Sequence, residues 1–152
     1  MADVPVKTLA LQVVGQALST ISEIKEVNRW RNAPVDLDGK SFPCLFFYEL
    51  GEVPNPRNRL MMNEIRLIVD TYVDVPAHGY EDFSDEMDIL QARIHNAIFS
   101  SQNKDVLKGL ILECQQGPTK KEYPNDINAL LRMEFFIIYG HNMGNAFSHV
   151  NY

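Results

Sequence analysis

Residues 62–76, MNEIRLIVDTYVDVP, alternate apolar and polar side chains almost without interruption. Because successive side chains of a strand point to opposite faces, this pattern predicts a strand with two different faces. One face is apolar and belongs in a core: Ile65, Leu67, Val69, Val73 and Val75. The other face is too charged for an interior, yet it also carries large apolar groups: Glu64, Arg66, Ile68, Asp70, Tyr72 and Asp74. The strand therefore raises the question of what its second face contacts.

The length and charge of the chain limit what it can be. With 152 residues, of which 45% are hydrophobic and 22% charged, the chain has the composition of one folded domain, which we place at residues 1–152. The formal net charge of -6 argues against a protein that holds nucleic acid by neutralising phosphates with lysine and arginine. It is compatible with a pore through which DNA slides, because an acidic surface repels a polyanion.

Hydrophobic periodicity divides the chain into helices and strands. Apolar residues at helical spacing predict amphipathic helices over residues 6–22 and 78–102. A short candidate strand lies at 27–31. The main strands are expected in four apolar runs: 44–50, 62–76, 109–117 and 129–140.

One amphipathic helix before each strand pair indicates the architecture. We predict an α/β (α+β) two-layer sandwich of order αββαββ, in which two helices cover one face of a mainly antiparallel four-stranded sheet. Residues 141–152 are interpreted as a C-terminal extension of this single domain. The opposite face of the sheet is left uncovered by the helices.

Patterns typical of catalysis or metal binding do not stand out in the sequence. The four histidines lack metal-ligand spacing, and no nucleophile elbow, phosphate loop or dinucleotide fingerprint occurs. Five carboxylates between Tyr80 and Asp88 fit the acidic first turns of a helix better than a metal site. We therefore predict a protein that is not an enzyme and that has no catalytic residue, no metal and no cofactor.

The order of these parts resembles the tail terminator, or tail completion, proteins of long-tailed bacteriophages. The resemblance begins with a helix like LALQVVGQALSTI, a short strand like EVNRW and a strand like FPCLFFYEL. After a long loop it continues with NEIRLIVDTYVDV, the amphipathic DEMDILQARIHNAIFS, and a final strand pair like LKGLILECQQG and LLRMEFFIIYG. It covers nearly the whole chain and is a match of pattern, with no catalytic residues to carry over.

The resemblance implies a structural virion protein at the head–tail junction, assembled in the host cytoplasm. Such proteins form a ring, commonly of six subunits, that caps the tail tube, ends its polymerisation and joins the tail to the head-side neck. The implied partners are other copies of the chain in a homo-oligomer, the tail tube protein, a head-side connector protein, and DNA that passes through the lumen without specific binding. No apolar run approaches the ~20 residues that cross a bilayer, so no membrane partner is expected.

Two other functions stay open at this point. A neighbouring neck or head-completion connector protein is the nearest alternative, because the sequence does not separate it from a terminator. A small α/β enzyme or ligand-binding domain is the distant alternative, and it would need a concave pocket with convergent polar groups.

Two surfaces are predicted to contact other proteins. The second face of the 62–76 strand is partly apolar and lies opposite the helices, so we expect a neighbouring subunit to cover it, with Ile68 and Tyr72 as anchors. The predicted subunit interface comprises Phe47, Ile68, Asp70, Tyr72, Phe136 and Ile138. The loop 51–59 is predicted to be an arm toward the tail tube or neck, stiffened by prolines. Its predicted contact residues are Pro54, Pro56, Arg57 and Arg59.

Overall fold

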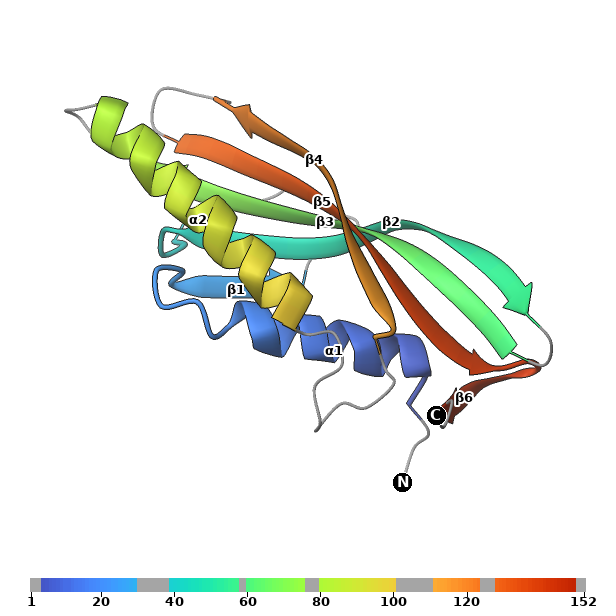
Figure 1. The fold of residues 1–152 in the computed structure, drawn as a ribbon. Helices are drawn as coiled ribbons and strands as arrows, with labels where there is room; N and C mark the ends of the chain where they lie inside the picture. Colours follow the sequence, from blue (N-terminus) through green and yellow to red (C-terminus); the bar gives the residue numbers. More distant parts are fainter. Residues whose placement is uncertain are drawn as a thin grey trace.

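The computed structural model of the protein describes these stretches of the chain: residues 4–29, 39–57, 60–75, 80–100, 111–123 and 128–149. Its elements follow in the order α1 (Val6–Leu18), β1 (Glu26–Arg29), β2 (Cys44–Arg57), β3 (Leu60–Asp74), α2 (Tyr80–Ser100), β4 (Glu113–Glu122), β5 (Asn128–Asn142) and β6 (Asn145–His149). The strands form one mostly antiparallel sheet, and both helices lie on the same face of it (Figure 1). The protein is thus an α+β fold with a helix layer and a sheet layer, as the sequence predicts.

The sheet is built around its two longest strands, β3 and β5. The strand order is β1-β2-β3-β5-β4, and β6 pairs with β5 beyond the end of β4. Among the described strands, β1 and β2 make the only parallel pair. β3 and β5 pair along their whole length, beginning with Leu60 opposite Asn142, and they place Ile65 beside Ile137 in the core. These two strands therefore form the middle of the sheet.

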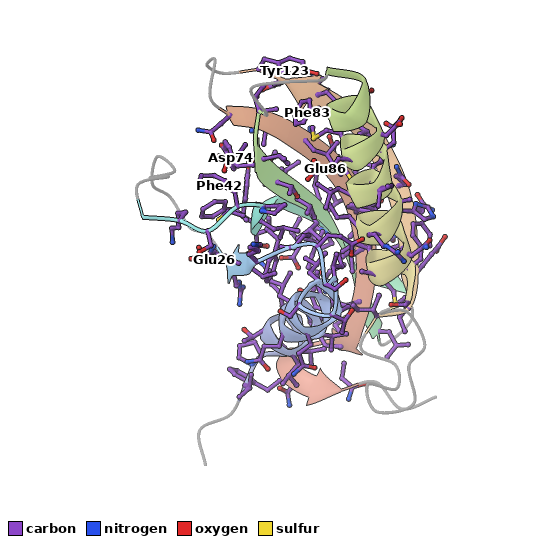
Figure 2. All side chains as sticks on the ribbon, turned by 90° about the vertical axis from the view of Figure 1, so that its left-hand side faces the viewer. Glu26, Phe42, Asp74, Phe83, Glu86 and Tyr123 are labelled. Atoms are coloured by element: carbon purple, nitrogen blue, oxygen red, sulfur yellow. The ribbon has the colours of Figure 1, made fainter. Side chains whose placement is uncertain are left out.

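The core lies between the sheet and the helix layer. The helices contribute mainly Val6, Ala10, Leu11, Val14, Leu18, Phe83, Met87, Leu90, Ile94 and Ile98. Figure 2 shows Phe83 between α2 and the sheet, where it is 2% exposed. α1 approaches β2 so closely that a Cβ atom on Gly15 would lie 3.0 Å from the Phe47 ring. A glycine inside the helix therefore permits this close contact of helix and sheet.

Two features of the sheet correct the sequence prediction. The sheet has six strands instead of four, and the element order is αβββαβββ instead of αββαββ. The candidate strand at 27–31 appears as β1, and residues Asn145–His149, assigned to an extension, form β6. Both strands are short, and β1 is half-buried along most of its length, so neither gives the strong alternation that identifies a strand.

β2 and β3 extend past the ends of both helices as a long hairpin (Figure 1). We call this hairpin the arm, and it consists of the strand segments 51–57 and 60–64. The predicted loop at 51–59 is therefore mostly strand. The arm begins at a bulge, where the register of β2 against β3 shifts between Glu49 and Gly51. A bulge of this kind bends a strand, and here it separates the arm from the part of β2 under the helices.

Two prolines lie in the arm at alternate positions of β2. Pro54 is opposite Asn63, and Pro56 is opposite Met61. Because proline has no N–H group to give to a ladder, both rings fit the strand only with their nitrogen turned away from β3. None of the described strands pairs with that outer edge along the arm. The prolines thus remove donors from an open edge and hinder another strand from adding to it.

Candidate interaction surface

The face of the sheet opposite the helices, here called the helix-free face, is formed by alternate residues of β2, β3, β5 and β4. Three adjacent rows, read from β2 across β3 to β5, are Tyr48–Ile68–Glu134, Phe46–Asp70–Arg132 and Cys44–Tyr72–Leu130. Each row contains an aromatic side chain, and the first two rows also contain charged ones. The face is therefore as mixed as the sequence of β3 predicts.

Asp70 is the centre of a polar network on this face. Its side chain is 2% exposed and accepts hydrogen bonds from Arg132 Nε at 2.8 Å and Nη2 at 3.0 Å. The Tyr48 hydroxyl donates a further hydrogen bond to Asp70 at 2.9 Å. The hydrogen bonds with Asp70 raise the pKa of Arg132, while burial and the Asp70 charge raise the pKa of Tyr48 to about 12. The network pairs a buried carboxylate with a cation, which is the condition for burying such a charge at low cost.

Ile68 and Asp70 are less accessible than predicted. As an anchor for a neighbouring subunit, Ile68 should be exposed in the single chain, but it is only 3% exposed. Its row neighbours are the long side chains of Tyr48 and Glu134, and the polar network closes the adjacent row. The charge of Asp70 pairs with Arg132 of the same chain, where the prediction places a pair across subunits. Ile68 and Asp70 are therefore covered by side chains of the same chain.

Phe47 lies on the opposite face from the one predicted. The register sets it beside Val69, and its side chain is 5% exposed within the helix-covered core. In β2 the residues that share the helix-free face are Cys44, Phe46 and Tyr48. Both alternate sets of CLFFYEL are apolar, so its sequence does not determine which set faces the helices.

Part of the predicted interface remains accessible. Half-buried side chains on the helix-free face are Tyr72, Phe136 and Ile138. The Tyr72 ring meets Phe46 edge to face, with ring centroids 5.9 Å apart. Phe136 lies opposite Arg66, whose guanidinium pairs with Glu134. Phe136 and Ile138 thus lie in adjacent rows, and Tyr72 lies three rows from Phe136, beyond the Asp70–Arg132 pair.

A second polar network fixes the arm to α1. Lys7 Nζ lies 2.6 Å from Glu49 Oε2 and 2.8 Å from Glu52 Oε2, so one cation bridges both sides of the bulge in β2. The Tyr139 hydroxyl donates a hydrogen bond to Glu52 Oε1 at 2.5 Å. Burial alone would lower the pKa of Lys7, but its contacts with the two carboxylates raise it above the ordinary value. The start of the arm is therefore tied to the helix layer.

A hollow of about 310 Å³ opens on the helix-free face where the arm begins. One row of the sheet crosses it, and this row consists of Val53, Glu64, Ile138 and Glu113. Val53 is 62% exposed. The Glu113 carboxylate accepts a hydrogen bond from the Gln115 side-chain amide. Neither Glu64 nor Glu113 forms an ion pair with any described residue. The hollow thus combines an apolar floor with two carboxylates that have no ion-pair partner among the described side chains.

Two of the predicted contact residues of the arm, Pro54 and Pro56, lie where a partner could reach them. Pro54 and Pro56 are exposed in β2, and Arg57 is the last residue of that strand. Arg59 lies outside the described residues. Leu50, at the bulge, is 57% exposed and adds a large apolar side chain to this part of the molecule. The arm therefore carries exposed apolar groups, and its β3 segment is backed by residues 138–142 of β5.

Other candidate groups do not assemble into a site in the described part of the chain. Within that part, no three His, Cys, Asp or Glu side chains are placed to hold a metal ion. His95 stacks on Phe99, with ring centroids 4.4 Å apart, and its Nδ1 atom contacts Gln116. His78 and the side chain of Asp82 lie outside the described residues. The described helices include none that is long and apolar enough to span a bilayer.

Two features of this surface could not be located from the sequence. Glu64 and Glu113 belong to strands separated by β5, so only the register brings them into one row. Asp70 and Arg132 carry a weak signal, since each is a charge in the middle of an apolar strand.

Comparison of the sequence with protein-family models and with curated proteins finds no match.

Proposed function

We propose that the protein is a structural subunit of a bacteriophage virion, a tail terminator that forms a ring of identical copies at the end of the tail tube. The ring ends tube polymerisation and joins the tail to the head-side neck, and DNA passes through its lumen without specific binding. The resemblance of the sequence pattern to this family along nearly the whole chain supports the proposal. The net charge of -6 is compatible with a lumen that does not retain DNA.

The arm is the observation that carries the proposal. It extends past both helices and is tied to α1 through Lys7. It exposes Val53 at 62%, and Leu50 at the adjoining bulge is 57% exposed. A subunit of an assembly buries such apolar side chains against its neighbour, and this supports the proposal. Pro54 and Pro56 hinder strand addition at the open edge, so contacts of the arm are made through side chains.

Assembly on tail tubes tests the proposal. Purified protein is mixed with tail tubes from the same phage and imaged by electron microscopy, in parallel with a Leu50→Ser, Val53→Ser variant. We expect the wild type to form a ring on one end of each tube and to stop its growth. The variant should fold, as judged by circular dichroism, and fail to cap tubes, because the replaced side chains are exposed and contribute little to the core.

The same experiment separates the alternative function. If the wild type binds isolated head connectors and leaves tube ends bare, a neck or head-completion role replaces the terminator role. Binding to neither tubes nor connectors would contradict a structural role at the head–tail junction.

A further inference from the structure

We infer that two copies of this chain pair through their helix-free faces about a twofold axis, with Phe136 at the centre of the contact. The partner that covers the face is thus a second copy, and each copy offers the same patch to the other. Such a pair is complete with two copies and closes no ring, so the inference does not rest on the proposed function. It concerns the protein before it meets a tail tube.

Two exposed residues of β4, Glu113 and Lys120, carry opposite charges on the helix-free face. Glu113 lies opposite Ile138 of β5, and Lys120 lies opposite Arg132. Lys121, next along the strand, forms an ion pair with a side chain of α2, so Lys120 points to the opposite side. Ile138 and Arg132 are six residues apart, or about 20 Å along an extended strand. The face therefore has two charged ends.

These charges are available to a partner as far as the described residues show. Neither Glu113 nor Lys120 forms an ion pair with a described residue. Glu64 lies in the same row as Glu113 and adds a second carboxylate to that end. At the other end the Arg132 side chain is 39% exposed, while its partner Asp70 is buried. One end is thus acidic and the other basic.

An apolar centre lies between the charged ends. The Phe136 ring lies against β4, where a Cβ atom on Gly117 would be 3.1 Å from Phe136 Cε2. The glycine therefore makes room for the ring over the edge strand. Phe136 and its neighbour in the next row, Ile138, are both half-buried in the single chain. A second copy would bury the apolar surface that they still expose.

A twofold axis that crosses the strands near Phe136 makes this patch complementary to itself. It reverses the strand direction and sets β4 of one copy over β4 of the other, so Glu113 of each copy meets Lys120 of the second copy. The two Phe136 rings meet at the centre, because Phe136 lies between the charged rows. A twofold axis along the strands would set each row against its equal and bring like charges together, which is unfavourable.

The hollow accommodates the lysine in this arrangement. Glu113 lines it together with the apolar side chains of Val53 and Ile138. Lys120 of the second copy would lay its aliphatic stem on the apolar floor and carry its ammonium group to Glu113, since long cationic side chains commonly bury the stem and keep the charge at a polar site. The contact thus uses the apolar floor and the acidic rim together.

The open edges of the described sheet are poor sites for the competing contact, in which copies join by strand addition. β1 has only four residues, and the arm carries Pro54 and Pro56 on its outer edge. In β4, Pro118 lies where the register against β5 shifts. Prolines, irregular pairing and short strands all hinder strand addition. A face is therefore the better surface for pairing two copies.

Charge reversal at the two ends tests this contact. Sedimentation equilibrium over a range of protein concentrations, without tail tubes, gives the dissociation constant of the dimer for Glu113→Lys alone, for Lys120→Glu alone and for their equimolar mixture. Glu86→Lys on α2 and Lys25→Glu before β1 are matched controls, because both change an exposed charge away from β4. Circular dichroism checks folding, and Glu113→Gln or Lys120→Gln replaces a reversal that does not fold.

We expect the wild type and both controls to be dimers. A reversed variant alone places like charges at both ends of the contact, so its dissociation constant should rise at least about tenfold. A neutral variant loses the attraction without adding repulsion and should show a smaller rise. In the mixture the two introduced charges face each other, and so do the two native charges. Mixed dimers should therefore form about as tightly as wild-type dimers.

Several outcomes would overturn the inference. They are a monomeric wild type, a reversed variant that dimerises like the wild type, and a mixture of folded variants that stays monomeric. Mixed assemblies larger than a dimer would also overturn it, because a head-to-tail contact continues beyond two copies. A monomer that still caps tail tubes would leave the terminator role standing without this contact. A dimer that binds no tubes would contradict the terminator role alone.

Discussion

The two faces of β3 are both largely closed to solvent, but by different means. On the helix-covered face, Ile65, Leu67 and Val69 are fully buried against the helices and their strand neighbours. On the helix-free face, Ile68 and Asp70 are almost as buried, although no described helix lies on them. There the cover consists of long side chains from β2 and β5 and of ion pairs between strands.

The difference shows that a charged strand face need not be an open one. Apolar packing buries the first face without regard to partners, because dispersion and the hydrophobic effect have little directionality. The second face depends on particular hydrogen bonds, and a buried carboxylate that loses its partner is costly. The two faces should therefore respond differently to substitution.

The largest expected effect is on the helix-covered face. Phe135 is fully buried in the core, so Phe135→Ala should lower the free energy of unfolding by about 3–5 kcal/mol. Its neighbour Phe136 lies on the helix-free face and is half-buried, so Phe136→Ala should cost only about 1–2 kcal/mol. Urea unfolding followed by circular dichroism measures both. Equal losses at the two positions would mean that the faces are packed alike.

The network on the helix-free face should give the next largest effect, and it should be asymmetric. Arg132→Met removes the cation from Asp70, which is 2% exposed, and should cost about 3 kcal/mol. Asp70→Asn leaves an Arg132 side chain that is 39% exposed and can reach water, and should cost about 1–2 kcal/mol. Urea unfolding of both variants and of the double variant checks the order. A larger loss for Asp70→Asn would contradict the burial of the carboxylate.

The sequence predicts the helix-covered face better than the helix-free face for a physical reason. The near-regular alternation in 62–76 and the charges at Arg132 and Glu134 in 129–140 assign the core residues of β3 and β5, because side-chain direction has a period of two. The same rule places Asp70 and Arg132 on one face, but their pairing depends on the register between strands. The register also decides the orientation of Phe47, since both sets of its strand are apolar. The hollow involves four strands and has no local signal.

A smaller effect is expected at Tyr48, and it should depend on pH. Burial, followed by the Asp70 charge, raises the pKa of Tyr48 from 10.0 to about 12. The folded state therefore holds this proton more tightly than the unfolded state, so the associated stability is complete below pH 10 and is lost as the pH rises toward 12. Tyr48→Phe should flatten part of the decline in the free energy of unfolding over this range.

Urea unfolding at a series of pH values gives the slope of the unfolding free energy against pH for the wild type and for Tyr48→Phe. Burial also raises the pKa of Tyr72, so the variant should keep some of the decline. At neutral pH the variant loses one hydrogen bond to a charged group, which should cost about 1 kcal/mol. An unchanged slope between the two proteins would show that the Tyr48 hydroxyl does not share a proton-dependent contact with Asp70.

The smallest expected effect is at the second arginine–carboxylate pair of the helix-free face. Arg66 pairs with Glu134 as Arg132 pairs with Asp70, but the Arg66 side chain is 51% exposed. Water solvates the Arg66 guanidinium and screens its attraction to Glu134, so this pair gains less than the Arg132–Asp70 pair, although the Glu134 side chain is only 13% exposed. Arg66→Met should therefore shift the urea midpoint by less than the same substitution at Arg132, because Glu134 can reach water more easily than Asp70 can. A shift at Arg66 as large as the shift at Arg132 would contradict this expectation. It would mean that the Arg66–Glu134 pair helps to cover Ile68 and that both pairs of the helix-free face stabilise the fold equally.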